Sequence, residues 1–180
     1  MNTTNNEEDL LVTFVFQFQN PESVRGLLAK GVSPNVIRES RTSVLMMAAM
    51  LPNSDICDAL IKAGAIVNCQ NEQGITPLHC ANTAKAAELL INAGAELEAT
   101  DDQGMTPLHY AVLKRNVHVI EGLLRHGANY LIPNDKGTSP FNAALYEGGA
   151  VFEAFSNRIA EERAHVQTVE LLNRIKRAAS

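Results

Sequence analysis

The 180-residue chain has no tryptophan, and its three tyrosines and six phenylalanines make aromatic residues only 5% of the sequence. A core with so few aromatic rings must consist mainly of Leu, Ile, Val, Ala and Met, which suits short, closely packed helices. Charged residues are also sparse, at 19%, while hydrophobic residues reach 46%, which excludes a disordered acidic tail. A chain of this length holds one domain or two small ones, which argues against a multidomain enzyme.

Basic residues are in the minority, because 15 Lys and Arg stand against 20 Asp and Glu, for a net charge of −5. Such a chain has no general attraction for phosphate backbones or anionic lipid. The first apolar run, residues 10–16, follows acids where a signal peptide needs basic residues. It is also far shorter than the roughly 20 apolar residues of a spanning helix. We therefore expect neither a nucleic-acid partner nor a membrane partner.

Cysteine is scarce too. Cys57, Cys69 and Cys80 form an odd number with no close pair, which favours a reducing compartment, and we expect a cytoplasmic protein. No C-x-x-C or H-x-x-x-H spacing indicates zinc, and Gly148-Gly149 lacks the residues that would complete a phosphate-binding loop. The sequence thus predicts no metal, no cofactor and no catalytic residues.

An internal repeat organises the chain. Residues 74–81 read GITPLHCA and residues 104–111 read GMTPLHYA, with looser copies at 41–48 and 137–144. A second marker, Gly-Ala after a Leu/Ile-rich run, recurs at positions 64, 94 and 127, and Gly31-Val32 is its degenerate first copy. Both markers advance by 33, 30 and 33 residues, so the repeat is not a coincidence of composition.

With this period and the T-P-L-H-x-A signature, the chain resembles the ankyrin repeat proteins over about residues 10–147. The resemblance implies an all-α solenoid of helix-turn-helix repeats with hairpin-like fingers. It also implies that the signature histidines, His79 and His109, tie neighbouring units together by hydrogen bonds. The residues agree with this fold, since Thr-Pro begins a helix and Gly127 ends one.

We expect a single domain, 1–180, of five units. These are an N-terminal capping repeat at 5–37, repeats at 38–70, 71–100 and 101–133, and a longer C-terminal capping repeat at 134–180. The 71–100 repeat lacks three residues between Ala81 and Ala86, so the wall of the stack should dip there.

The last unit looks irregular because its second-helix pattern, Val166, Val169 and Leu172, arrives about sixteen residues later than the repeat predicts. We interpret the difference as a helical insertion. A continuous helix over 151–176 would be about 39 Å long. It would either cap the open end of the stack or dock a partner.

The resemblance implies that a protein partner binds the concave face, which the fingers and the inner helices form. Matched by repeat phase, the expected partner-binding residues form an apolar stripe edged by acids: Met47, Met50, Leu51, Glu72, Ile75, Asp102, Met105, Tyr110, Leu113, Lys114 and Tyr146. Adaptable Met-rich surface beside carboxylates suits a basic or amphipathic segment. The prediction is a monomeric, non-catalytic protein–protein interaction module that acts as an adaptor, regulator or inhibitor.

Three alternatives stay open. The C-terminal helix could dock the partner instead, as in a bacterial effector or a regulatory subunit. An enzyme would need a clustered nucleophile and base, which the sequence lacks. Nucleic acid could bind basic residues near the C-terminus, although Glu161, Glu162 and Glu170 interleave with them; these are Arg158, Arg163, Arg174, Lys176 and Arg177.

Overall fold

The structure, a computed structural model, describes residues 3–178, with side chains for residues 6–165 and 167. Over residues 3–178 the chain forms ten α-helices and no strand. The helices come in pairs, one pair per unit: α1 (Thr3–Phe16) and α2 (Pro21–Ala29), α3 (Val44–Ala49) and α4 (Asp55–Lys62), α5 (Pro77–Cys80) and α6 (Ala84–Asn92), α7 (Pro107–Leu113) and α8 (Val117–Arg125), α9 (Pro140–Glu147) and α10 (Gly149–Ala178).

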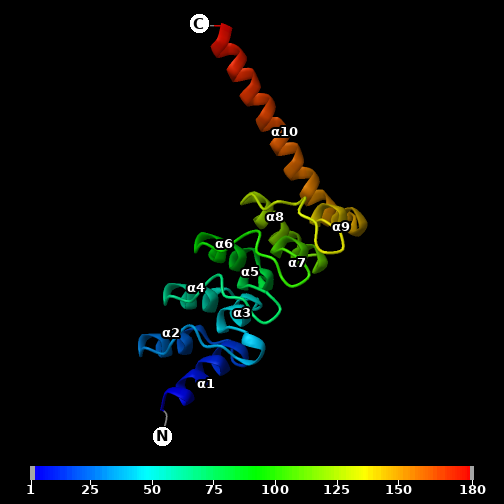
Figure 1. Ribbon diagram of the computed structural model, residues 1–180. Coiled ribbons are helices and arrows are strands. Elements are labelled where there is room, and N and C mark those ends of the chain that lie inside the picture. The colour runs from blue at the N-terminus through cyan, green and yellow to red at the C-terminus, as the bar shows by residue number, and fades with distance from the viewer. Residues whose placement is uncertain (1–2, 179–180) are drawn as a thin grey trace.

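The pairs stack into two layers (Figure 1). Each odd-numbered helix contacts the next odd-numbered helix, and each even-numbered helix contacts the next even-numbered one. The turns that join successive units project on the side of the odd-numbered layer away from α2, α4 and α6 (Figure 1). The predicted all-α solenoid is confirmed. The odd-numbered helices and the finger turns form the side of the stack that corresponds to the expected concave face, and we keep that name for it.

The first helix of each repeat copy begins directly after a Thr or Ser that caps its N-terminus. Thr76 and Thr106 each form a capping box with the histidine three residues later, and a proline occupies the first turn of both helices. In the looser copies Ser43 and Ser139 take the same place, and their hydroxyls accept a backbone N–H (both 3.2 Å). The signature therefore works as a helix N-terminus in every unit that carries it.

The core is a series of thin aliphatic layers between the helices, as the low aromatic content predicts. Its largest fully buried side chains are mostly leucine and isoleucine: Leu11, Leu45, Ile56, Leu60, Leu78, Leu90, Leu108, Ile120, Leu123 and Leu124, together with Met46 and Phe155. Phe155 joins the C-terminal layer, where its ring contacts Tyr130 and Phe141.

The three-residue deletion shortens one inner helix. Helix α5 has only four residues, against six in α3 and seven in α7. The chain after α5 turns back at once, and the backbone N–H of Asn82 donates to the carbonyl of Ala49 in the preceding unit (3.0 Å). The odd-numbered layer is therefore shorter along the helix axis at α5 than at α3 and α7.

The interpretation of the last unit as carrying an insertion is wrong. Helix α10 begins nine residues after Pro140, close to the ten residues that separate Val117 from Pro107 in the preceding unit. Val151 and Phe155 are buried, and the helix contacts α8 and α9, so the second helix of this unit is in register. The helix continues for 30 residues and extends away from the stack (Figure 1). The side chains of Val166, Val169 and Leu172 lie outside the described residues.

Candidate partner-binding face

The finger turns are joined to one another by backbone hydrogen bonds. Each bond runs from the tip of one finger to a carbonyl of the preceding finger: Glu72 N–H to Ser40 O (3.1 Å), Asp102 N–H to Gln73 O (3.0 Å) and Asp135 N–H to Gln103 O (3.0 Å). The ladder holds the acidic tips in a row, with their side chains exposed. The fingers thus form a fixed rim along the concave face.

Asp101 stabilises its finger from within. Its Oδ1 accepts the backbone N–H groups of Gln103 (2.9 Å) and Met105 (2.8 Å), and its Oδ2 accepts the hydroxyl of Tyr110 (2.7 Å). Burial opposes ionisation of Asp101, but these hydrogen bonds outweigh it and lower the pKa of the carboxyl. Burial and the bond to Asp101 raise the pKa of Tyr110. The tyrosine hydroxyl is therefore already engaged inside the protein.

The structure divides the predicted stripe by exposure. Met50, Leu113 and Tyr146 expose 57%, 64% and 94% of their surface, and the finger acids Glu72 and Asp102 are exposed as well. The middle of the stripe is only partly exposed: Met47, Ile75, Met105 and Tyr110.

Leu51 does not belong to the surface, because only 7% of it is exposed and it packs in the hydrophobic core. Helix α3 ends at Ala49, and the chain after its cap turns Leu51 inward. Its assignment to the partner-binding stripe is corrected accordingly.

Lys114 spans the gap left by the short helix. Its Nζ donates to the carbonyls of His79 (3.3 Å) and Cys80 (3.5 Å), at the C-terminal end of α5 in the preceding unit. Burial lowers the pKa of this amine. A lysine at a helix C-terminus is favoured by the helix dipole, so Lys114 stabilises the shortened unit.

A groove opens at the N-terminal end of the concave face, with a volume of about 810 Å³. We call it the N-terminal groove; it is lined by Asp9, Val12, Thr13, Phe16, Ile37, Arg38, Glu39, Thr42, Met47 and Met50. Phe16 and Ile37, exposed by 63% and 55%, are candidate binding residues that the repeat phase missed. The 3.6-residue spacing of Asp9, Val12 and Phe16 could have indicated a shared helix face. Nothing in the sequence showed that the first finger would meet that face.

The signature histidines form the inter-unit bonds expected of them. The Nδ1 atoms of His79 and His109 accept the backbone N–H groups of Thr76 (3.1 Å) and Thr106 (3.0 Å). Their Nε2 atoms lie 2.9 Å and 3.0 Å from carbonyl oxygens of the next finger. Burial lowers the pKa of both rings. These side chains are occupied in holding the stack together.

Other reactive groups are poorly placed for chemistry. Burial raises the pKa of the Cys57 thiol to about 12 and of the Cys80 thiol to about 11, which disfavours the thiolate. Among the described residues, no group of three or more His, Cys, Asp or Glu side chains could hold a metal ion. No helix in the described part of the chain is long and apolar enough to cross a membrane.

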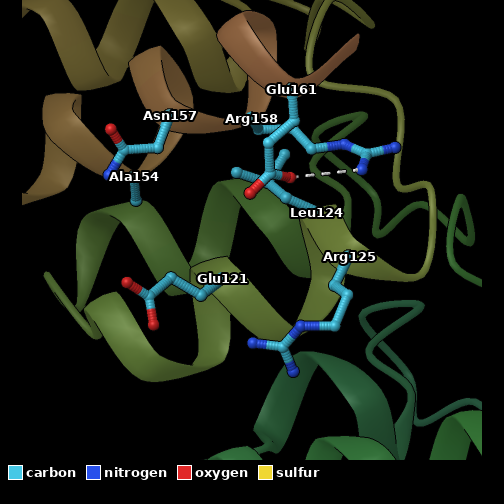
Figure 2. Close-up of a pocket in the computed structure, with 7 residues that line it drawn as sticks. All are labelled: Glu121, Leu124, Arg125, Ala154, Asn157, Arg158 and Glu161. Carbon is cyan, nitrogen blue, oxygen red and sulfur yellow. Dashed lines mark ion pairs between the residues drawn. The ribbon is translucent and has the colours of Figure 1, made fainter. Parts of the chain in front are cut away.

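A smaller hollow of about 250 Å³ lies between α8 and α10 (Figure 2). Arg158 forms an ion pair there with Glu161 (3.7 Å) and a second one with Glu162 (3.1 Å), which lies outside the hollow, while Glu121 and Arg125 line the hollow from α8. Because charges of both signs face each other, the hollow offers little net field for an ionic ligand. Carboxylates already engage Arg158, one of the basic residues considered above for nucleic acid.

A family model described as ankyrin repeats (3 copies) matches residues 12–101 and 82–172. The two matches overlap and together cover most of the chain, from within α1 to within α10. They include the short 71–100 repeat, all of α9 and most of α10.

Proposed function

Because the chain belongs to the ankyrin repeat family, we propose that it is a non-catalytic interaction module that binds a protein partner on its concave face. Ankyrin repeats are in general protein–protein interaction modules, and their stacks create extended binding surfaces. We assign binding to this face because three of its large apolar side chains, Met50, Leu113 and Tyr146, expose more than half of their surface. Large exposed apolar side chains grouped on one face are typical of an interaction site.

The framework behind these side chains favours binding. The finger ladder and the histidine bonds fix the face before a partner arrives, so little conformational entropy is lost on association. Tyrosine is among the commonest residues at interaction hot spots, and Tyr146 offers nearly its whole side chain. The exposed carboxylates of Glu72 and Asp102 at the rim favour a partner segment with basic residues. In this proposal the module acts as a cytoplasmic, monomeric adaptor, regulator or inhibitor.

Docking through α10 is the second candidate. The observation in its favour is that this helix runs for 30 residues, more than three times the length of α8, and extends away from the stack (Figure 1). Its N-terminal part is already buried against α8 and α9, so only the projecting part is available to a partner.

Affinity capture with charged variants tests the concave face. We expect Leu113→Asp and Tyr146→Asp to reduce recovery of the partner at least tenfold, as measured by quantitative mass spectrometry of proteins captured from the native organism. The matched control is Ile66→Asp, because Ile66 is 59% exposed directly after α4, lies outside the inner helices and comes six residues before the finger tip at Glu72. Unchanged recovery with both concave-face variants, with folding verified by circular dichroism, would contradict the proposal. If only a variant truncated after residue 165 fails to recover the partner, the result would instead support docking through α10.

A further inference from the structure

The N-terminal groove differs from the rest of the concave face in size and in lining. At about 810 Å³ it exceeds the other described hollows, which measure about 250, 300 and 450 Å³. Its apolar side chains come from three separate elements, with Phe16 on α1, Ile37 before the first finger and Met50 at the end of α3. All three are more than half exposed. The hollow can therefore accept several apolar side chains of one ligand.

The walls of the groove favour a helical ligand over an added strand. One wall is α1, whose 14 residues extend about 21 Å and present Asp9, Val12 and Phe16 at helical spacing. On the opposite wall, two donors of the first finger are satisfied within it, since Arg38 N–H bonds Thr42 O (2.8 Å) and Thr42 N–H bonds Glu39 O (3.1 Å). In the described part of the chain this finger holds only an isolated bridge between Ile37 and Ser43, so it offers no strand edge for a ligand to extend. A ligand there meets mainly side chains, which is the situation of a helix in a groove.

The charges that line the groove indicate which polar residues should flank the apolar face of the bound helix. Arg38 forms an ion pair with Asp9, which neutralises both. Glu39 lines the groove and has no ion pair among the described side chains, residues 6–165 and 167. The residues that line the groove thus carry a net charge of −1 beside an apolar floor, which complements a Lys or Arg that flanks the apolar face of a ligand.

The first finger is also strained. Ser40 and Arg41 have φ angles of 55° and 58°, in the left-handed region that L-residues avoid. At the position of Arg41 the next three fingers carry glycine: Gly74, Gly104 and Gly137, with φ between 71° and 75°. Strained positions of this kind concentrate at binding sites. The side chain of Arg41 is exposed next to the groove-lining residues Glu39 and Thr42. It is therefore placed to contact a ligand in the groove.

We propose that the N-terminal groove binds one amphipathic helix of the protein partner, with bulky apolar residues at i, i+3 or i+4, and i+7 facing the groove and a basic residue next to Glu39. Arg41 contacts the same helix from the tip of the first finger. The inference rests on the proposed function, because it assigns the anchoring part of the concave face and the chemistry of the segment that it receives.

A library of 16-residue peptides displayed on phage and selected against the full chain supplies a defined probe. We expect the enriched peptides to share that apolar spacing with at least one Lys or Arg, and to bind the wild type at least tenfold more tightly than Ile37→Asp or Phe16→Asp by fluorescence anisotropy. Ile66→Asp is the matched control and should bind like the wild type. Two groove variants are used because Ile37 is exposed and its change leaves the core intact even if Phe16→Asp disturbs α1.

Arg41→Gly separates recognition from folding. We expect this variant to unfold at a higher urea concentration than the wild type, since glycine relieves the strain, and yet to bind the selected peptides several-fold more weakly. A merely structural role for Arg41 would leave peptide affinity unchanged, and that result would remove Arg41 from the proposal.

The outcomes distinguish this inference from the proposed function. Peptides that bind Ile37→Asp and Phe16→Asp as tightly as the wild type, but lose affinity for Leu113→Asp or Tyr146→Asp, would overturn the groove assignment and leave concave-face binding intact. Peptides insensitive to all four substitutions would contradict both. Failure to enrich any peptide with the stated spacing would also count against the groove.

Discussion

The geometry around His79 and His109 fixes the protonation state of both rings. In each case Nδ1 faces a backbone N–H, so it must accept, and the proton therefore lies on Nε2, which donates to a carbonyl oxygen of the next finger. A second proton on Nδ1 would oppose the N–H of Thr76 or Thr106 and would place a charge in a buried site. The neutral ring is thus part of the joint between units.

This arrangement predicts that the protein loses stability in mild acid. In the unfolded chain a histidine titrates near pH 6.5, whereas burial lowers the pKa of both rings in the folded state. Below about pH 6.5 the unfolded state therefore binds more protons, and the free energy of unfolding falls as pH decreases, by up to about 1.4 kcal/mol per pH unit for each ring. Urea denaturation at pH 7.5, 6.5 and 5.5 measures this slope.

A control variant identifies the groups responsible. His79→Gln should have a shallower slope over the same interval, because one of the two buried rings no longer titrates. The interval lies above the range in which ordinary carboxyl groups titrate, so Asp and Glu contribute little. A free energy of unfolding that is the same at pH 7.5 and pH 5.5 would show that these rings are not held neutral.

The side chains that line the candidate partner-binding face were only partly predictable from the sequence. Repeat phase identifies which positions lie on the concave side, but the exposure of a side chain depends on how the helix before it ends. Leu51 follows the end of α3 and turns into the core, whereas its neighbour Met50 stays exposed. Phe16 and Ile37 were missed because they come from the degenerate first unit, and their proximity depends on tertiary packing.

At the scale of helices, α5 is the least self-sufficient element. It has four residues, so it is no longer than about one turn, and most of its carbonyls have no partner within the helix. Lys114 of the next unit supplies donors to two of them, at His79 and Cys80. The stability of the short repeat thus depends on a side chain from its neighbour.

Lys114→Met should lower the free energy of unfolding by about 0.5–1 kcal/mol, because the carbonyls at the end of α5 lose a charged donor while water can still reach them. The matched control is Lys62→Met, which breaks a surface pair with Asp58 (2.7 Å) four residues away and should cost at most about 0.5 kcal/mol. Urea denaturation compares the two, and amide chemical shifts of residues 79–82 report on α5. An equal decrease in the free energy of unfolding of both variants would show that Lys114 does not stabilise α5.

Helix α10 shows a limit of apolar periodicity as a predictor, because the spacing alone does not show which turn of a helix packs on its neighbours. Apolar residues recur at three-, four- and seven-residue steps from Phe152 through Leu172, which indicated helical structure but left open whether it forms one continuous helix, as it does in α10. The same pattern fits every part of that helix equally well, so it did not show which turn packs on α8. The choice is made by Phe155, which fills the space between Tyr130 and Phe141.

At the scale of the whole molecule, the protein is a row of units in which each pair of helices packs on its neighbours. The hydrogen bonds between units are also short-range, because finger tips and signature histidines bond only to the adjacent unit. Stability in such a stack is approximately the sum of unit and interface contributions, so damage at one end need not spread to the other.

Phe155→Ala is the change that tests this picture. Phe155 is fully buried, and truncation of a buried phenylalanine costs about 3–5 kcal/mol. Hydrogen exchange should therefore show loss of amide protection in α9 and the first turns of α10, a smaller loss in α7 and α8, and near wild-type protection in α1–α4. Tyr146→Ala, which removes an exposed aromatic ring from the same unit, should leave the pattern unchanged. If protection instead falls equally in all five units, the stack unfolds as one cooperative body, and the N-terminal groove would then depend on packing at the opposite end of the molecule.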